Sequence, residues 1–559
     1  MTTEAKEAMF CRQCEQTLNC TACTAHGVCG KDPDTAVMID VLIYVLMGVG
    51  YWGRLAREEG VKTPAADSFI MRGLFTTITN VNFDPHEIMM LVQEGYKVEQ
   101  ELRSAFLAAF KKKNGAEFGG LSLPRRDWEP GDAYAVVLER GKAARIVNPD
   151  LPEDVQSLRE LLLYGMKGMA AYAEHASVLG HEDDTVKAFF YKGLSALAED
   201  VRDVAKLLDL VMELGRVNFR CMEVLDAANT GAYGHPVPTK VFLGAKKGPA
   251  ILVSGHDLLD LQQLLEQTEG KGINIYTHGE MLPAHGYPGL KKYKHFAGHY
   301  GTAWQNQYKE FSAFPGAILM TTNCIQRPAN VYKENIFTTG VVRWPGVPNI
   351  AAIGGKKDFS AVIKRALDLG GYKEDVPGKE ILVGFAHNAI LAAAGKVVEL
   401  VKAGKIKHFY LVGGCDGAKP GRNYYTEFAA RVPKDSVILT LACGKFRFNT
   451  QEFGDIDGIP RLLDCGQCND AYSAIVVASA LAKAFNCTIN ELPLTLIISW
   501  YEQKAVCVLL TLLALGVKNI RLGPSLPAFV SPGVMAILSQ KFGLWPIGGV
   551  DEDLKMNRP

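Results

Sequence analysis

The sequence predicts a multidomain α + α/β protein, with an N-terminal helical bundle followed by two α/β domains whose sheets are mostly parallel. Apolar residues recur at intervals of three and four through residues 1–228. Beyond that point, short β-branched runs alternate with amphipathic stretches. A chain of 559 residues also has the length of about three to four domains. We therefore expect domains at 1–228, 229–375 and 376–559.

The helical domain is expected from amphipathic segments that contain few internal Gly or Pro residues. These segments are residues 34–59, 86–113, 153–179 and 184–225. In each, the spacing places apolar side chains on one face of a helix. The turn-rich sequence NTGAYGHPVP at 229–238 ends this pattern and marks the first domain boundary.

The α/β region is expected from apolar, strand-like runs that alternate with amphipathic segments. The expected strands are residues 250–254, 273–277, 317–321, 381–385, 409–412, 437–440 and 494–499. Residues 257–267 and 388–402 are helical segments between them. This alternation favours a parallel sheet covered by helices. The sequence DLGGYKEDVPGK at 368–379 lacks both patterns and divides the region into two.

Composition excludes several classes of protein. The 60 Lys and Arg residues balance 60 Asp and Glu residues, which argues against a nucleic-acid-binding surface spread over the whole chain. A hydrophobic content of 48% excludes a mainly disordered chain. Apolar runs such as 506–517 are shorter than the roughly 18 residues that span a bilayer. The first ten residues lack the apolar core of a signal peptide. We expect a cytoplasmic protein that binds neither nucleic acid nor a membrane.

Five of the thirteen cysteines lie in the segment CRQCEQTLNCTACTAHGVCG at 11–30, namely Cys11, Cys14, Cys20, Cys23 and Cys29. A disulfide framework is disfavoured in a reducing compartment, so metal or redox chemistry is the better interpretation. A zinc ribbon separates its two CxxC pairs by about 15 to 20 residues, a spacing absent here. An iron–sulfur cluster takes thiolates from one compact loop. A small zinc knuckle is the alternative. Spacing does not decide which cysteine is spare, Cys20 or Cys23.

A second group of metal-binding side chains follows the predicted strands. Its members are His256, Glu280, Cys324, Cys415, Cys443, Cys468 and the pair Glu502 and Lys504. The carboxyl ends of parallel strands meet at one edge of a sheet, so these residues are expected to converge. Singly, a buried small cysteine or a solvated glutamate explains each of them, but seven such positions together favour a shared site. For Glu502 and Lys504, the alternative is a solvated surface ion pair worth at most about 1 kcal/mol.

The donor types in this second group indicate a catalytic iron site. Thiolates suit iron–sulfur chemistry, while the imidazole and carboxylates are harder donors. Hard donors favour oxygen species and open coordination positions, which are features of catalysis rather than of electron storage. Glycines at positions 413, 414 and 417 allow the backbone around Cys415 to approach a bulky cofactor.

These motifs resemble those of a known family over essentially the whole chain. They are Cys11-x2-Cys14-x8-Cys23-x5-Cys29 followed in order by SGHDL, THGEML, TTNCIQRP, VGGCDG, CGQCND and SWYEQKAV. The sequence is similar to the hybrid cluster protein family, also called prismane proteins or hydroxylamine reductases. The resemblance implies a helical domain and two Rossmann-like α/β domains. The x8 spacing resembles the branch of the family with an N-terminal [4Fe–4S] cluster.

The resemblance also implies the cofactors and their ligands. One [4Fe–4S] cluster would be held by Cys11, Cys14, Cys23 and Cys29, which leaves Cys20 spare. One hybrid Fe–S–O cluster, of the [4Fe–2O–2S] type, would be held by the eight residues His256, Glu280, Cys324, Cys415, Cys443, Cys468, Glu502 and Lys504. In the family the residue matching Cys415 carries a persulfide. The neighbouring Cys465 leaves the assignment of Cys468 open, whereas the cysteines at 221, 487 and 507 are expected in the core.

The implied reaction is the reduction of hydroxylamine, NH2OH + 2 e⁻ + 2 H⁺ → NH3 + H2O. The residues expected to take part in catalysis are Glu502, Lys504, Cys415 and His278, with His278, Lys504 and one carboxylate as candidate proton donors. Electrons would come from an external donor protein, either ferredoxin-like or an NADH-dependent reductase. The alternatives are reduction of nitric oxide to nitrous oxide and exchange of nitrosyl groups with proteins through Cys415. A carbon monoxide dehydrogenase is disfavoured because of the carboxylates in the set.

Overall fold

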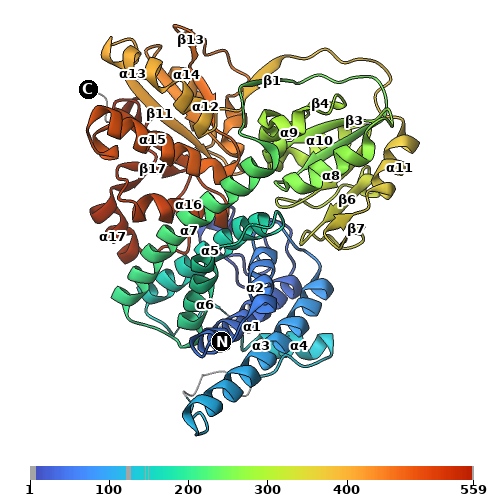
Figure 1. The fold of residues 1–559 in the computed structure, drawn as a ribbon, viewed down its shortest axis with the longest axis vertical. Helices are drawn as coiled ribbons and strands as arrows, with labels where there is room; N and C mark the ends of the chain where they lie inside the picture. The colour runs from blue at the N-terminus through green and yellow to red at the C-terminus, as the bar shows by residue number, and fades with distance from the viewer. Residues whose placement is uncertain (1–7, 121–127, 145, 149, 557–559) are drawn as a thin grey trace, which may run out of the picture.

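The computed structural model describes residues 8–120, 128–144, 146–148 and 150–556. It has an N-terminal helical part and two α/β parts that lie side by side on top of it (Figure 1). We call these parts the helical domain (α1 to α7), the middle α/β domain (β2 to α11) and the C-terminal α/β domain (β11 to α18). The predicted fold class is confirmed.

The helical domain is a bundle built around an apolar first helix. Its helices are α1 (Pro33–Glu58), α2 (Pro64–Thr76), α3 (Pro85–Asn114), α4 (Tyr134–Gly141), α5 (Glu153–Ser177), α6 (Asp184–Ala198) and α7 (Val204–Tyr233). The sequence predicts one helix over 184–225, but the structure has two there. Asp203 begins the second, because its carboxylate accepts a hydrogen bond from the amide of Lys206 at 2.8 Å. Helix α7 continues to Tyr233, past the expected boundary at 228.

Helix α1 is the one described helix that is long and apolar enough to cross a membrane by length and composition. Of its most apolar window, 78% is buried inside the structure. The helix packs against α3 and α6, so the interior of the bundle accounts for its apolar surface.

The middle α/β domain contains a parallel sheet of six strands. In spatial order they are β4 (Phe296–His299), β3 (Asn274–His278), β2 (Ala250–Ser254), β5 (Ala317–Met320), β6 (Ile336–Thr339) and β7 (Asn349–Ile350). The covering helices are α8 (Leu258–Thr268), α9 (Pro288–Lys291), α10 (Gln307–Ala313) and α11 (Ser360–Leu369). The short strands β8 (Ala352–Ile353) and β9 (Lys356–Lys357) pair antiparallel outside this sheet. Strands β2 and β5 are buried along their whole length.

The C-terminal α/β domain repeats this plan. Its parallel strands, in spatial order, are β15 (Leu462–Asp464), β12 (Ser436–Thr440), β11 (His408–Gly414), β16 (Leu494–Ser499), β17 (Ile520–Gly523) and β18 (Leu544–Pro546). Its helices are α12 (His387–Ala392), α13 (Ala394–Lys402), α14 (Asn423–Arg431), α15 (Ala471–Phe485), α16 (Gln503–Ala514), α17 (Pro532–Phe542) and α18 (Val550–Asp553). A small antiparallel pair, β13 (Asp455–Ile456) with β14 (Ile459–Pro460), lies apart from the sheet.

One predicted strand does not join a parallel sheet. The run at 381–385 forms β10 (Glu380–Val383), which pairs antiparallel with β1 (Thr239–Phe242). These two strands form a ribbon of their own, and each precedes one of the α/β domains in the chain. The apolar run correctly indicated a strand, but its partner was not readable from the sequence.

Helix α16 belongs to the C-terminal α/β domain in sequence and packs against α5 and α7 of the helical domain. Two glycines permit the close approach. A Cβ atom at Gly168 would lie 2.3 Å from the carbonyl oxygen of Gln503, and one at Gly215 would lie 2.2 Å from that of Leu510. This contact matters for function because α16 begins directly after Glu502.

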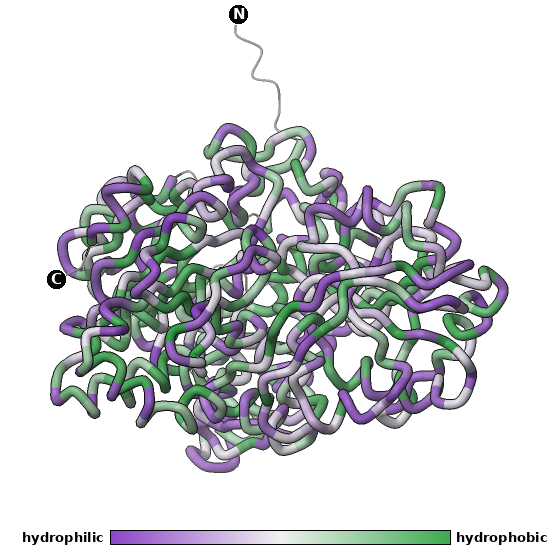
Figure 2. Tube along the Cα trace, turned by 90° about the horizontal axis from the view of Figure 1, so that it is seen from above, coloured by the Kyte–Doolittle hydropathy of each residue, from purple (hydrophilic) through white to green (hydrophobic). Residues whose placement is uncertain are grey.

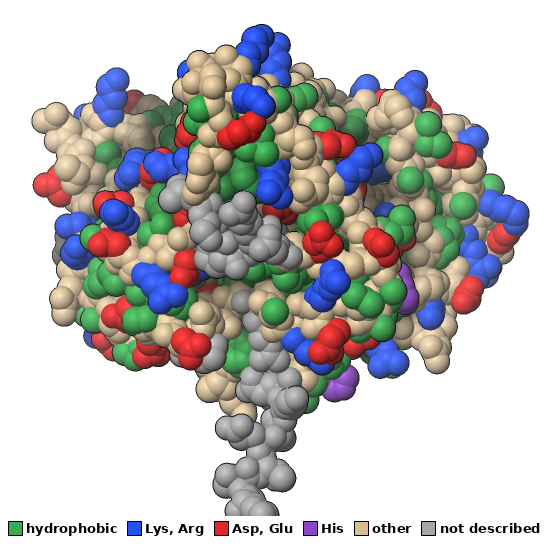
Figure 3. Space-filling view, turned by 90° about the horizontal axis from the view of Figure 1, so that it is seen from below, with side chains coloured by type: hydrophobic (Ala, Val, Ile, Leu, Met, Phe, Trp, Pro, Cys, Tyr) green, Lys and Arg blue, Asp and Glu red, His purple; other side chains and the backbone are tan. Residues whose placement is uncertain are grey.

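The surface is mixed in character. Hydrophilic segments lie mostly around the outside of the molecule in the hydropathy view (Figure 2). On the face seen from below, acidic and basic side chains are interspersed (Figure 3). This agrees with the balance of charged residues in the sequence.

Candidate metal centres

Seven of the eight side chains predicted to follow the strands, all except Lys504, line one cavity to which both α/β domains contribute. The residues lining it are Ser254, Gly255, His256, Gly279, Glu280, Trp304, Asn323, Cys324, Cys415, Cys443, Cys468, Tyr501 and Glu502. They lie just beyond the carboxyl ends of strands from both α/β domains. We call this cavity and its lining the inner site. Neither α/β domain contains the whole set, so the inner site exists only when both domains are in place.

Three donors of the inner site, an imidazole, a carboxylate and a thiol, lie close together. Ligand atoms of His256, Glu280 and Cys468 are all within 4.8 Å of one another. The backbone amide of Cys468 donates a hydrogen bond to the Glu280 carboxylate at 2.9 Å. Burial by itself raises the pKa of Glu280, but the hydrogen bond and charge of His256, with the charge of Lys504, bring it down to about 2. Glu280 is therefore a carboxylate, ready to bind a cation.

Lys504 contacts the wall of this site, although its side chain does not line the cavity. Its ammonium group donates to Oδ1 of Asn323 at 2.9 Å, and its Nζ lies 3.1 Å from Nε2 of His256. The side chains of Lys504 and Glu502 are 2% and 4% exposed, with Nζ and Oε1 3.7 Å apart. The alternative of a solvated surface ion pair is therefore wrong. Nδ1 of His256 lies 2.8 Å from Oγ1 of Thr322, and its Nε2 also lies 3.4 Å from Oε2 of Glu280.

The four thiols of the inner site need a compensating cation in order to ionise. Burial, together with the nearby charge of Glu502, raises the pKa of Cys415 to about 12. Burial likewise raises the pKa of Cys324, Cys443 and Cys468 well above its ordinary value. Thiolates in such a place are stable only beside positive charge, which metal ions supply. The mixed donors fit a large iron–sulfur–oxygen group, with soft sulfur on one part and hard nitrogen and oxygen on another.

His278 does not line the inner site. Its Nδ1 is 3.0 Å from Oγ of Ser254, and its Nε2 is 2.9 Å from Oε2 of Glu310. Both ring nitrogens are engaged, and the side chain is fully buried. This environment suits a residue that positions Ser254 at the cavity wall. The catalytic role expected for His278 stays a prediction without a contact to the cavity.

The N-terminal cysteines form a second group. Cys11 and Cys23 lie opposite each other on antiparallel backbone, joined by amide hydrogen bonds of 3.1 and 2.8 Å. Burial raises the pKa of Cys14 well above its ordinary value, and the charges of Cys29, Cys11 and Cys23 raise it further. These four thiols are thus close enough to interact. Among the described residues, no three of these cysteines have their sulfur atoms within 4.8 Å of one another. The sulfurs around one zinc ion lie about 3.8 Å apart, so this arrangement does not suit a single zinc ion.

The sequence did not decide whether two further cysteines, Cys20 and Cys465, belong to the ligand sets. Cys20 is exposed and points to Lys419, whose Nζ donates to its sulfur at 2.8 Å. Among the alternatives Cys20 and Cys23, the structure thus places Cys20 apart from the other N-terminal thiols. Cys465 is buried, and its thiol donates to the carbonyl oxygen of Leu463 at 3.8 Å. It is absent from the lining of the inner site, which Cys468 joins.

An aromatic pair at the inner site was not predicted from the sequence. Tyr501 and Trp304 stack with ring centroids 4.3 Å apart, and both line the inner site. Burial raises the pKa of Tyr501 strongly, and the charges of Cys14 and Cys324 add to the effect. Tyr501 therefore lies within electrostatic reach of both groups. Tyr501 could have been found from the sequence, because it directly precedes Glu502 in the motif SWYEQKAV.

A buried ion pair also connects the two regions. Nη2 of Arg422 donates to Oε2 of Glu15 at 2.9 Å and to the carbonyl oxygen of Trp500 at 3.0 Å. Nη1 of Arg422 donates to Oγ of Ser499 at 2.6 Å. The amide of Glu15, next to Cys14, donates to the carbonyl oxygen of Tyr501 at 2.9 Å. The N-terminal loop is thereby fixed to the end of strand β16.

Comparisons with known proteins agree with this architecture. A family model described as Prismane/CO dehydrogenase family matches residues 9–555. The chain belongs to this family. It is 57% identical to a hydroxylamine reductase of Thermodesulfovibrio yellowstonii over 553 residues, covering 98% of this chain and 99% of that protein. It is 56% identical to a hydroxylamine reductase of Syntrophobacter fumaroxidans and 52% identical to one of Methanocella arvoryzae, each with the same coverage.

Solved structures with much lower sequence identity have a similar fold. A Ni-free carbon monoxide dehydrogenase from Thermococcus sp. AM4 superposes with a TM-score of 0.53 at 17% identity, covering 99% of this chain and 90% of that one. Carbon monoxide dehydrogenase IV from Carboxydothermus hydrogenoformans gives 0.54 at 15% identity, covering 100% and 94%. At these identities the likeness concerns the fold alone.

Proposed function

We propose that this chain is a hydroxylamine reductase, an iron–sulfur oxidoreductase that catalyses NH2OH + 2 e⁻ + 2 H⁺ → NH3 + H2O. The observation that carries the proposal is the mixed set of thiol, imidazole and carboxylate donors around one buried cavity. The full-length relatives named hydroxylamine reductase, at 52 to 57% identity, support it.

Two clusters are proposed. The N-terminal one is a [4Fe–4S] cluster held by Cys11, Cys14, Cys23 and Cys29, as in the branch of the family suggested by their spacing. The second is a hybrid Fe–S–O cluster held by His256, Glu280, Cys324, Cys415, Cys443, Cys468 and Glu502, with Lys504 beside it as a hydrogen-bond donor and with a persulfide on Cys415. When bound, this group supplies electrons and an open iron position that acts as a Lewis acid on the N–O oxygen.

The protein's own residues hold charge and protons around this group. Thr322 fixes the ring of His256, and the amide of Cys468 fixes the Glu280 carboxylate. Lys504 is the proton donor that the geometry favours, because its ammonium faces the cavity wall rather than solvent. Walls such as Trp304 and Tyr501 exclude bulk water from the cavity.

Electrons enter, in this proposal, at the N-terminal cysteines from an external cytoplasmic donor, either a ferredoxin-like protein or an NADH-dependent reductase. Exposed Cys20 marks the surface of that loop. Tyr501, which stacks on Trp304, lies within electrostatic reach of both groups of cysteines, and this supports a short path for electrons.

The proposal is tested by measuring iron, labile sulfide and turnover in the same preparation. We expect about eight irons per chain and two distinct spectroscopic signals. Reduced viologen should drive turnover of hydroxylamine, with nitric oxide and carbon monoxide as competing substrates in parallel assays. Zinc in place of iron would exclude both clusters. If carbon monoxide were the one substrate turned over, the chain would be a carbon monoxide dehydrogenase and not a hydroxylamine reductase.

Replacing Cys11 by Ser is expected to remove the N-terminal cluster and leave the spectrum of the hybrid cluster largely in place. The reason is that the two proposed ligand sets share no residue. Turnover with a protein donor should fall more than turnover with a small dye that reaches the inner site. Cys20→Ser is the matched control and should change neither spectrum. Equal loss of both signals in Cys11→Ser would show that the two sites fold as one unit.

Lys504→Met is expected to leave the iron content near that of the parent and to lower hydroxylamine turnover by about 10- to 100-fold. The methionine keeps the length of the side chain but removes the ammonium group that faces His256 and Asn323. Lys483→Met on the exposed end of α15 is the control. Turnover equal to the parent would remove Lys504 from the proposed mechanism.

A further inference from the structure

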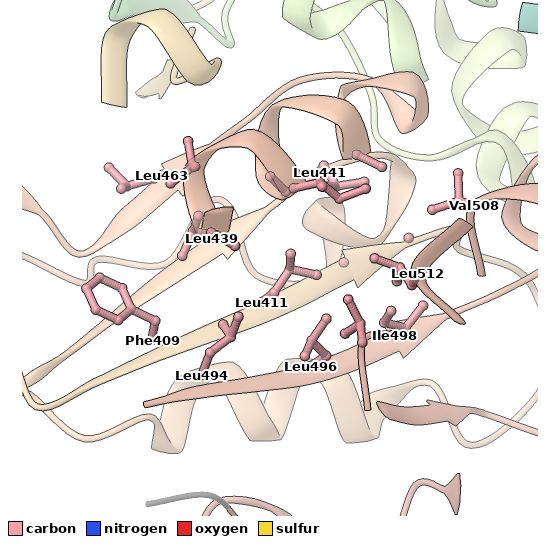
Figure 4. Close-up of a pocket in the computed structure, with 18 of the residues that line it drawn as sticks. Phe409, Leu411, Leu439, Leu441, Leu463, Leu494, Leu496, Ile498, Val508 and Leu512 are labelled. Atoms are coloured by element: carbon pink, nitrogen blue, oxygen red, sulfur yellow. The ribbon is translucent and has the colours of Figure 1, made fainter. Parts of the chain in front are cut away.

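Two cavities outside the inner site differ in their lining. The first lies in the C-terminal α/β domain, where aliphatic side chains such as Leu411, Leu439 and Ile498 project from the strands toward a common space (Figure 4). The second lies in the helical domain, has a volume of about 270 Å³ and is lined by residues of the N-terminal loop, α1 and α5. Several charged side chains line the second, which we call the N-terminal cavity.

Positive charge predominates in the described lining of the N-terminal cavity. The cations there are Arg12, Lys31 and Lys167, and the lining contains one carboxylate, that of Asp40. Cys11, a proposed ligand of the N-terminal cluster, lines the same cavity. The three cations are therefore gathered beside this group of cysteines.

Arg12 has a carboxylate partner of its own. Its Nε donates to Oε1 of Glu160 at 3.0 Å, and the side chain of Glu160 is 0% exposed. The hydroxyl group of Tyr164 donates to the same oxygen at 3.0 Å. The charges of Arg12 and Glu160 largely cancel at a distance, so this pair contributes little net charge to the cavity.

Lys31 and Lys167 form no ion pair with any described carboxylate, although they are only 3% and 1% exposed. Nζ of Lys167 donates to Oε1 of Gln13 at 2.8 Å and to the carbonyl oxygen of Thr77 at 3.3 Å, which are both neutral groups. Burial and the charge of Lys31 lower the pKa of Lys167 to about 7. A buried ammonium group is costly without a counter-anion, so the two lysines point to an anionic group beside them.

The proposed N-terminal cluster is the anion that fits this place. Gln13 lies between Cys11 and Cys14 in the sequence, so Lys167 is hydrogen-bonded to the loop that carries two of the four proposed ligands. The charge of Cys11 acts on the pKa of Lys167, and the charge of Lys31 acts on that of Cys11. A four-iron cluster with four thiolates carries a net negative charge, which increases on reduction.

We propose that the ammonium groups of Lys167 and Lys31 raise the reduction potential of the N-terminal cluster and so favour the entry of electrons from the external donor. Positive charge fixed in a buried place stabilises the reduced, more negative form of a cluster over the oxidised form. The inference rests on the N-terminal cluster of the proposed function. It does not depend on which nitrogen compound the inner site reduces.

The test measures the potential itself, which a merely structural role of the lysines would not move. The iron-loaded Lys167→Met protein is held at the potential that reduces half of the N-terminal cluster in the parent, and the reduced fraction is measured by electron paramagnetic resonance. At equal iron content, the ratio of reduced to oxidised cluster should fall about 10-fold, which corresponds to about 59 mV for one electron. Methionine keeps the length of the side chain and removes the ammonium group.

Lys206→Met is the matched control, because Lys206 is exposed on α7 and water screens its charge. It should leave the ratio unchanged. If Lys167→Met does not fold, Lys31→Met decides the test and should lower the ratio in the same direction. An unchanged ratio in the folded variant would overturn the inference, while the cluster and the proposed function stand.

Two other outcomes separate this inference from the proposed function. A parent protein without a signal from the N-terminal cluster would overturn the inference together with that part of the proposed function. If the ratio falls as expected but hydroxylamine is not turned over, the proposed reaction fails and the inference stands.

Discussion

Replacing Glu502 by Gln is expected to lower hydroxylamine turnover at least about 100-fold while most of the iron and sulfide stays bound. The substitution keeps the size of the side chain and removes only the charge. In the structure the carboxylate is 4% exposed, lines the inner site and accepts a hydrogen bond from the amide of Lys504 at 2.9 Å. The amide oxygen of glutamine still accepts this bond, so the start of α16 should be preserved.

The reason for the large effect is the type of donor that is lost. An anionic oxygen is the ligand expected to hold a hard, oxygen-bearing iron, and a neutral amide binds such a metal weakly. The thiolate-bound part of the cluster depends on Cys324, Cys415, Cys443 and Cys468, which the substitution does not touch. Iron and sulfide analysis with steady-state assays on reduced viologen would show the two effects separately.

The control is Glu427→Gln, since Glu427 is exposed and pairs with the exposed Arg431 on α14. It should change neither iron content nor turnover. Normal turnover in Glu502→Gln would contradict the assignment of this carboxylate to the hybrid cluster. Loss of all iron together with activity would instead show that Glu502 is needed for assembly of the whole group.

Arg422→Met is expected to destabilise the protein by about 3 to 5 kcal/mol, because it removes the nearer and fully buried of the two cations beside the buried carboxylate of Glu15 and leaves only Lys419, at 3.7 Å. The side chains of Arg422 and Glu15 are 1% and 0% exposed. The guanidinium also donates to Ser499 and to the carbonyl oxygen of Trp500. Thermal unfolding of the iron-loaded protein, followed by circular dichroism, should show the loss as a lower melting temperature.

Two comparisons make this prediction specific. Arg431→Met removes an exposed pair with Asp551 and should cost less than about 1 kcal/mol. The double variant Glu15→Gln with Arg422→Met should be more stable than Arg422→Met alone, because no charge is then buried without a partner. An Arg422→Met protein with the melting temperature of the parent would show that water replaces the arginine. The ion pair would then have no role in holding the N-terminal loop to β16.

The sequence was most informative where the signal is local. Helical periodicity and short apolar runs indicated the longest helices and the central strands, because amphipathic spacing reflects burial along one element, but helices such as α2 and α15 were not predicted. Local pattern failed at 184–225, where Asp203 begins a new helix, and at 381–385, where the strand pairs with β1 instead of a parallel sheet. An apolar run predicts a strand, but it does not predict which other strand it pairs with.

The candidate inner site was also predictable from local information plus one rule of topology. Donors that directly follow parallel strands lie at one edge of the sheet, so His256, Glu280 and the cysteines at 324, 415, 443 and 468 were expected together. The rule does not give the direction of a side chain. His278 ends β3 beside the same edge, yet it faces Ser254 and Glu310 behind the cavity wall.

The sequence by itself therefore determined the fold class, the two groups of cysteines and the strand ends that carry the second group. Only the tertiary structure decided that Cys20 faces Lys419 and that Tyr501, stacked on Trp304, lies near both groups. These features depend on contacts between residues hundreds of positions apart. Such contacts arise from the packing of whole domains against each other, and no periodicity within one segment encodes them.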